Sequence, residues 1–247
     1  MCVCIEGYDV QIQIEEDYEG EHRHVELDSI LTLVRPEQEE KDSNSKRRRS
    51  IVVFAHGSGS SGRHSPRNRY VASVLNNESR IGTLLIDLLT AEEQEIDEKT
   101  REYRFNIKLL ANRLAAITDW LVKNSKTQNV TIGYFGASTG AAAALIASVV
   151  ERPTGDDDVV KAIVSRGGRP DLANSSYLKK VQAPTLLLVG SKDNSQVIAL
   201  NQKALQQLKS AKEKRLVMIP GAGHLFEEPG TLEEAARHAA SWFEKYL

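Results

Sequence analysis

A serine flanked by glycines is the strongest sign of chemistry in this sequence. Ser138 lies in the stretch GASTG at positions 136–140, which matches the pattern G-x-S-x-G. An apolar run precedes it and an alanine-rich run follows it, so the serine is expected where a buried strand passes into a helix. Glycines would permit the sharp turn that exposes the hydroxyl, although glycine and serine are also common in ordinary turns. The surrounding pattern favours a nucleophile.

A serine hydroxyl is a weak nucleophile at neutral pH, so it needs a base. Among six histidines, His224 is the best candidate, because it follows the last predicted strand in a glycine-rich loop. The alternative is a turn histidine without chemistry, and for His56 we expect a structural role. Asp193 follows another buried strand and would orient the imidazole. Asp171 and the acidic run at 156–158 are its alternatives.

Short apolar or alternating segments predict the strands that would position these groups. They cover residues 9–15, 25–34, 51–55, 84–89, 130–135, 160–164, 185–189 and 216–219. Helical periodicity marks residues 106–123, 141–150, 197–208 and 232–246, and residues 90–104 predict an exposed loop or a short helix. The alternation predicts an α/β fold with a mostly parallel, doubly wound sheet, an N-terminal antiparallel strand pair and helices on both faces.

The domain organisation follows from the same pattern. We expect a single domain over residues 1–247, with an edge hairpin and a charged connection in 1–49 and a catalytic core in 50–247. In such sheets ligands bind beyond the carboxyl ends of the strands, so the loops after the strands are where a site is expected.

A glycine-rich loop at 56–62 follows the first buried strand. Its backbone can approach a ligand closely, and we expect the N–H of Ser58, with Gly57 as its neighbour, to stabilise an oxyanion. The second donor would be the N–H of Thr139, the residue after the nucleophile. A phosphate-binding loop is the alternative, but neither of the common nucleotide-binding glycine motifs is present.

Composition excludes several other classes. The formal net charge is −2 and the isoelectric point about 6.3, which does not suggest a nucleic-acid or acidic-membrane partner. Cys2 and Cys4 cannot form a disulfide framework or a metal site by themselves. The basic run at 46–49 is interpreted as a solvated connection. Without a membrane-length apolar stretch or a signal-peptide pattern, we expect a cytoplasmic protein without a metal or cofactor; its oligomeric state stays open.

Four motifs together resemble the dienelactone-hydrolase-related group of the α/β-hydrolases: HGSG at 56–59, GASTG at 136–140, GSKD at 190–193 and GAGHLFEEPG at 221–230. The chain order of serine, aspartate and histidine also agrees with that fold. Dienelactone hydrolases proper use a cysteine nucleophile, whereas this chain has serine. The resemblance therefore implies a serine hydrolase without a cap domain that cleaves a small ester, lactone or thioester.

Three arginines near the expected site have no role in that scheme. Arg166 and Arg169 follow a strand beside glycines and could bind a carboxylate or phosphate of the substrate, or instead pair with Asp171 or the acidic segment at 92–95. Arg63, in the loop after the first buried strand, is a further candidate for substrate contact. The alternative to an esterase is a hydrolase-fold protein that binds a small ligand with little turnover; a peroxide-using enzyme on the same residues is a third possibility.

Overall fold

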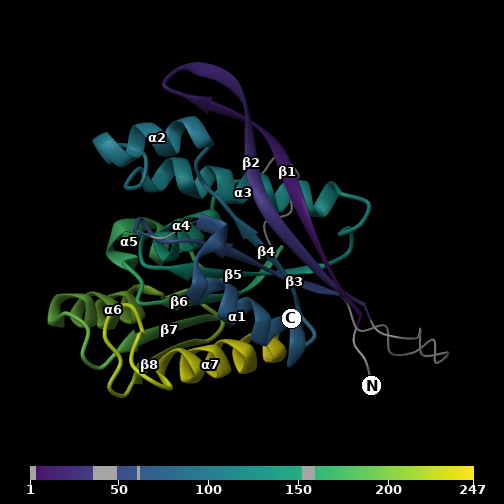
Figure 1. Ribbon diagram of the computed structural model, residues 1–247. Helices are drawn as coiled ribbons and strands as arrows, with labels where there is room; N and C mark the ends of the chain where they lie inside the picture. Colours follow the sequence, from purple (N-terminus) through teal and green to yellow (C-terminus); the bar gives the residue numbers. More distant parts are fainter. Residues whose placement is uncertain (1–3, 36–48, 60–61, 152–158) are drawn as a thin grey trace.

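The computed structural model describes residues 4–35, 49–59, 62–151 and 159–247. Its centre is one eight-stranded sheet with the strand order β1-β2-β4-β3-β5-β6-β7-β8 (Figure 1). The strands are β1 (Cys4–Tyr18), β2 (Glu21–Arg35), β3 (Ser50–Ala55), β4 (Gly82–Ile86), β5 (Thr131–Ala137), β6 (Val160–Arg166), β7 (Thr185–Gly190) and β8 (Lys214–Ile219). Each predicted strand is present.

The sheet is mixed in the way that the sequence predicts. β1 and β2 form an antiparallel hairpin, and β2 pairs antiparallel with β4 from Ser29 to Thr32. All further pairs, from β4 through β3 to β8, are parallel. The carboxyl ends of β3, β5, β6, β7 and β8 therefore meet at one edge. The prediction of a mostly parallel sheet with an N-terminal antiparallel pair is confirmed.

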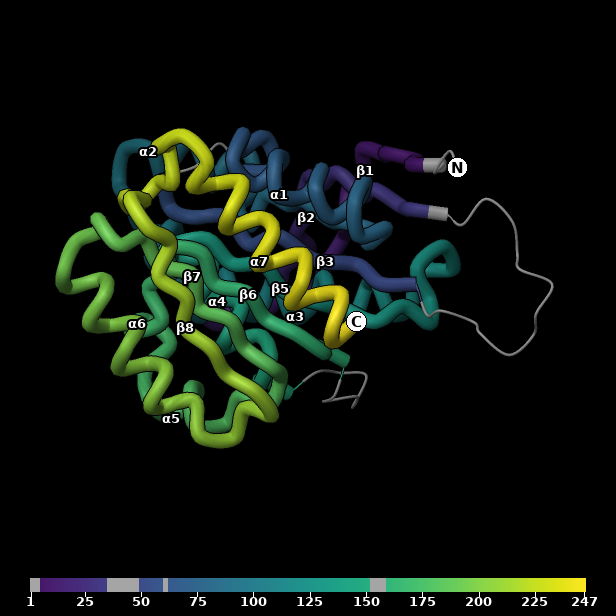
Figure 2. The backbone as a smooth tube through the Cα atoms, turned by 90° about the horizontal axis from the view of Figure 1, so that it is seen from below, coloured from purple at the N-terminus to yellow at the C-terminus, as the bar shows by residue number. Residues whose placement is uncertain are grey.

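Helices cover both faces of the sheet. They are α1 (Pro66–Asn77), α2 (Ala91–Thr100), α3 (Ile107–Lys123), α4 (Thr139–Ala147), α5 (Asn174–Leu178), α6 (Ser195–Gln207) and α7 (Thr231–Tyr246). Because side chains alternate along a strand, Val52 and Phe54 belong to the core beneath α1 and α7, while Ile51 and Val53 belong to the core beneath α3 and α4. Figure 2 shows α1 and α7 side by side over the first of these faces.

One helix is absent from the sequence prediction. The sequence pattern gives no helix between residues 56–62 and 84–89, but α1 forms there, beginning at Pro66. Residues 90–104, expected as an exposed loop or a short helix, contain the short helix α2. The Thr90 side chain accepts a hydrogen bond from the N–H of Glu93 at 3.2 Å, and the Glu93 carboxylate accepts one from the N–H of Thr90 at 3.0 Å. This reciprocal cap stabilises the start of α2. Cys2, most of the basic run 46–49 and the acidic run 156–158 lie outside the described residues.

A buried ionic cluster fixes α2 and the hairpin above α3. Arg113 is fully buried and donates to Glu93 at 2.5 and 2.7 Å and to Glu16 at 2.7 and 2.9 Å. Arg23 from β2 bonds to both carboxylates as well. Burial would raise the pKa of Glu93, but the bonds and charge of Arg113 outweigh burial and lower it. Glu93 therefore remains ionised beside Arg113 inside the protein.

Candidate active site

Ser138 occupies a strained turn between β5 and α4. Its backbone angles are φ 50° and ψ −118°, a conformation that side-chain-bearing residues rarely adopt. Such strain costs about 1–3 kcal/mol and tends to occur at functional sites. The loop after β6 holds this residue on both sides, because Ser138 N–H donates to Arg166 O at 3.2 Å and Arg169 N–H donates to Ser138 O at 3.1 Å.

Two glycines make this turn possible. A Cβ at Gly136 would lie 2.4 Å from the Cα of Ala141, and one at Gly140 would lie 2.2 Å from the carbonyl oxygen of Ala55. Side chains at these positions would force α4 away from the sheet. The motif therefore contains glycine because the first turn of α4 packs directly on β3 and β5.

The loops after β7 and β8 bring Asp193 and His224 together. Nδ1 of His224 lies 2.9 Å from Oδ2 of Asp193, whose side chain is buried, while the histidine side chain is 37% exposed. The other carboxylate oxygen accepts the N–H of Asn194 at 2.7 Å. A Cβ at Gly190 would lie 2.2 Å from the carbonyl oxygen of Ala222, so the close approach of the two loops requires glycine there. Asp171, the alternative acid, pairs with Arg169 instead.

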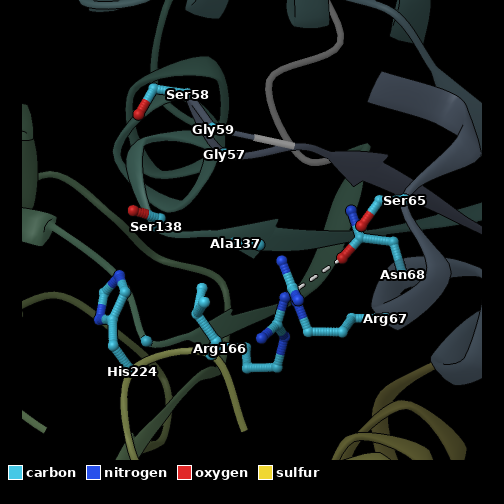
Figure 3. A pocket seen from close by; sticks show the side chains of 12 residues that line it. Gly57, Ser58, Gly59, Ser65, Arg67, Asn68, Ala137, Ser138, Arg166 and His224 are labelled. Carbon is cyan, nitrogen blue, oxygen red and sulfur yellow. Dashed lines mark hydrogen bonds between the residues drawn. The ribbon is translucent and has the colours of Figure 1, made fainter. Parts of the chain in front are cut away.

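Two adjoining cavities meet at Ser138 and His224, which line both. The first has a volume of about 230 Å³ and is lined further by Gly57, Ser58, Gly59, Ser65, Arg67, Asn68, Ala137, Arg166, Gly167 and Leu225 (Figure 3). The second has a volume of about 320 Å³ and is lined further by Arg169, Lys192, Asp193, Asn194 and Val197. The serine and the histidine thus lie where a bound molecule could reach them.

The loop after β3 reaches the same place. Gly57 and Ser58 line the first cavity, and a Cβ at Gly57 would lie 3.1 Å from the Cβ of Ser138. The ring of His56 lies against this loop, with Nδ1 3.1 Å from Gly57 O and Nε2 accepting the N–H of Leu88 at 3.1 Å. Burial lowers the pKa of His56, which keeps the ring neutral. The two bonds require the same state, because only a neutral ring can donate through Nδ1 and accept through Nε2. The expected structural role of His56 agrees with these bonds.

Thr139 is the first residue of α4, directly after Ser138. The first N–H groups of a helix have no partner within the helix, and the helix dipole favours negative charge at this end. The backbone N–H of Thr139 is therefore a candidate donor beside the serine.

The three arginines of interest have separate environments. Arg166 lines the first cavity and is 5% exposed. Arg169 lines the second cavity, and its guanidinium donates to Asp171 at 2.8 and 2.9 Å, which raises its pKa. Arg63 lies in neither cavity but pairs with Asp87 and, at 3.2 Å, with Asp28. The structure therefore does not bring Arg63 to the site.

The start of α1 contributes residues that the sequence pattern did not single out for the site. Ser65, Arg67 and Asn68 line the first cavity. Ser65 before Pro66 is typical of a helix start, and this signal could have placed the end of a helix here. The side chains that reach the cavity, however, depend on how α1 lies across the sheet.

This arrangement of sheet, elbow and loops is that of the α/β-hydrolases, and the comparisons with known proteins agree. The chain is 50% identical to a dienelactone hydrolase from Anabaena variabilis, over 97% of this chain and 99% of that one, with a TM-score of 0.78. It therefore belongs to the dienelactone-hydrolase-related group of the α/β-hydrolases. Residues 164–247 also match the model of the prolyl oligopeptidase family.

More distant structures share the fold. The esterase Est1E from Butyrivibrio proteoclasticus, solved with ferulic acid bound, is 17% identical over 94% of this chain and 98% of its own, with a TM-score of 0.68.

Proteins of two Mycobacterium tuberculosis strains are 53% identical over 81% of this chain and bear the name "Putative phosphoribosyl transferase". The alignment spans only 42% of their length. None of the helices in the described part of this chain has the length and apolar character of a membrane span.

Proposed function

We propose that this protein is a serine hydrolase that cleaves a small ester, lactone or thioester through an acyl-enzyme. The observation that carries the proposal is the placement of the strained Ser138 and the Asp193-bonded His224 on the same two cavities. We further propose that residues 1–247 act as one domain in the cytoplasm, with a small molecule as substrate and no cofactor.

The first step would be attack by the serine. Asp193 accepts the Nδ1 proton of His224, which leaves Nε2 as the base. His224 would take the proton from the Ser138 hydroxyl while its oxygen bonds to the carbonyl carbon of the substrate. The protonated imidazole, stabilised by the carboxylate, would then give that proton to the leaving alkoxide or thiolate.

The second step would release the acyl group. Water would attack the acyl carbon while His224 takes its proton, and the imidazolium would then give that proton to the departing Ser138 oxygen, with a carboxylic acid as product. In both steps the negatively charged oxygen of the former carbonyl group would accept hydrogen bonds from the N–H groups of Thr139 and Ser58. Gly57 would keep this loop close to the serine. Removing one such donor in other hydrolases costs about 10²–10³ in kcat.

The test is turnover of 4-nitrophenyl butyrate, with labelling by a fluorophosphonate probe as a second readout. Ser138→Ala should abolish both, because no other nucleophile is proposed. Ser73→Ala changes an exposed serine whose hydroxyl donates to Tyr70 O, and it should leave both unchanged. Full activity in Ser138→Ala would disprove the mechanism.

A hydrolase-fold protein that binds a small ligand with little turnover is the competing function. It predicts neither ester turnover nor probe labelling in a correctly folded protein. The strained backbone at Ser138 favours the enzyme, because a ligand-binding loop alone does not need a serine in this conformation.

The name of the mycobacterial relatives suggests phosphoribosyl transfer. Because the alignment spans 42% of their length, we propose that this activity belongs to the part of those proteins that the chain does not match. The isolated chain should release no diphosphate from phosphoribosyl diphosphate in the presence of purine or pyrimidine bases. Diphosphate release would contradict this assignment.

A further inference from the structure

Arg166 is a buried arginine that has no counter-ion in the described part of the chain. It is the last residue of β6, and among the described residues no carboxylate forms an ion pair with it. Its Nη2 donates to Asn68 Oδ1 over a long distance of 3.4 Å, and its guanidinium carbon lies 5.4 Å from the centre of the Phe226 ring. Its Nε is buried and has no hydrogen-bond acceptor in the described structure. Burial first, and the charge of Arg67 second, lower its pKa to about 10.

The contrast with Arg113 makes this unusual. Arg113 is also buried, but two carboxylates and the Leu88 carbonyl satisfy its guanidinium. A buried charge without such partners is costly to the folded state. Arg166 lies on the wall of the first cavity, where an anionic ligand could supply what the protein does not.

A second cationic element faces the same cavity. The N-terminus of α1, a helix of 12 residues, contributes Ser65, Arg67 and Asn68 to the cavity wall. Pro66 has no N–H, and the N–H groups of Arg67 and Asn68 are first-turn donors without a partner inside the helix. The Ser65 side chain does not cap this end. Helix N-termini with free donors favour anions.

Arg67 adds a further unfilled donor. Its Nη1 lies 3.1 Å from the carboxylate of Glu227, whose side chain is 65% exposed. Its Nε is buried and has no acceptor in the described structure. Figure 3 shows the side chains of Arg166 and Arg67 close to each other, with Asn68 and Ser65 beside them and Ser138 and His224 across the cavity.

We propose that Arg166, Arg67 and the N-terminus of α1 form a phosphate-binding subsite, so that the substrate of this hydrolase is an ester, lactone or thioester that carries a phosphate group. This inference rests on the proposed hydrolase function. Donors come from three separate groups that line the cavity, namely the guanidinium groups of Arg166 and Arg67 and the backbone of a helix turn. A phosphate group is a tetrahedral dianion with three oxygens, so it can accept a hydrogen bond from each of the three donor groups. A planar carboxylate offers only two oxygens and one charge.

The first experiment measures binding without turnover. Inorganic phosphate at constant ionic strength should raise the thermal unfolding midpoint of the protein, and acetate should raise it less. The shift should vanish in Arg166→Met and shrink in Arg67→Gln. Arg69→Met, which changes an exposed arginine of the same helix, should keep the full shift. An equal phosphate shift in Arg166→Met, or none in the unaltered protein, overturns the subsite.

The second experiment measures substrate preference with 4-nitrophenyl esters of 3-phosphonopropionic, succinic and butyric acid. A charge-assisted contact is worth about 1.5–3 kcal/mol, so kcat/KM for the phosphonate ester should exceed that for the butyrate by about tenfold or more. Arg166→Met should remove this preference, and Arg69→Met should keep it. A preference for the succinyl ester over the phosphonate ester overturns the choice of phosphate.

The two proposals fail separately. If butyrate is hydrolysed with dependence on Ser138 but the phosphonate ester is no better, the subsite is wrong and the hydrolase remains. If phosphate binds through Arg166 but none of the three esters is cleaved, the hydrolase and its phosphorylated substrate are wrong and the anion site remains. Removal of the unpaired charge in Arg166→Met should also leave the ligand-free protein at least as stable as before, so loss of folding is not expected to obscure the result.

Discussion

Nδ1 of His224 lies 2.9 Å from Oδ2 of Asp193, although the two residues follow different strands. Their loops meet because β7 and β8 are parallel neighbours and because Gly190 leaves room for the carbonyl of Ala222. The bond fixes which imidazole nitrogen faces the carboxylate. In the proposed mechanism the other nitrogen, Nε2, acts as the base.

Asp193→Asn should therefore lower kcat for ester hydrolysis by about 10⁴, because an amide holds the ring but favours the wrong tautomer and does not stabilise the imidazolium. Steady-state kinetics with 4-nitrophenyl butyrate measure the loss. Asp171→Asn, which removes the partner of Arg169 instead, is the matched control and should retain most of the activity. Comparable losses in both variants would show that Asp193 has no special role.

Much of the fold was predictable because the parallel strands are buried on both faces and their apolar runs are unmistakable. The ends of the strands were less predictable. β5 continues two residues beyond the predicted end because Gly136 and Ala137 pair with β6. The helix α1 was missed because its sequence is polar on average and its few buried apolar residues, such as Val71 and Leu75, give only a weak periodicity.

The candidate site was also predictable only in part. The placement of Ser138, Asp193 and His224 around one site was predictable because each stands in a local motif after a strand. The state of Arg166 was not, because its lack of a carboxylate partner among the described residues is a property of the folded structure. The sequence left Asp171 and the acidic segment 92–95 as possible partners, but Arg169 pairs with the first and Arg113 with Glu93.

Gly57→Ala tests how closely the loop after β3 must approach the serine. The new methyl group would lie 3.1 Å from the Cβ of Ser138 and 3.2 Å from Ala137 O, so the loop should move by a few tenths of an ångström. Since the loop N–H groups are proposed oxyanion donors, kcat should fall by about 10²–10³, the loss seen when one donor is removed.

Gly59→Ala is the matched control, because a Cβ there meets no atom within 4 Å in the described structure. Its kcat should stay close to that of the unaltered protein. Thermal unfolding of both variants separates a local displacement from general destabilisation. An active Gly57→Ala variant would contradict the placement of the oxyanion donors.

Arg113→Met should destabilise the protein by about 3–5 kcal/mol, because it leaves the buried carboxylates of Glu93 and Glu16 without their main partner. Urea unfolding at neutral pH measures the change. Lys245→Met breaks an exposed pair with Glu213 and should have little effect. If both substitutions lower the free energy of unfolding by the same amount, the cluster does not stabilise the fold as inferred.

His56 should make stability depend on pH. Burial lowers the pKa of His56 below its ordinary value of 6.5, so below that pH the unfolded chain binds a proton that the folded protein does not. The contribution of His56 to the free energy of unfolding is present above pH 6.5 and is lost as the pH falls from 6.5 through the lowered pKa. The slope from this one group can reach about 1.4 kcal/mol per pH unit.

His56→Gln should therefore flatten the decline in unfolding free energy between pH 7 and pH 5, whatever its effect on stability at pH 7. Urea unfolding at half-unit pH intervals gives both slopes. His22→Gln is the control of opposite sign: the bond to Asp17 raises the pKa of His22, so its contribution is present below pH 6.5 and is lost as pH rises. That variant should not flatten the decline. An unchanged slope in His56→Gln would mean that this imidazole is not held neutral against the loop at Gly57.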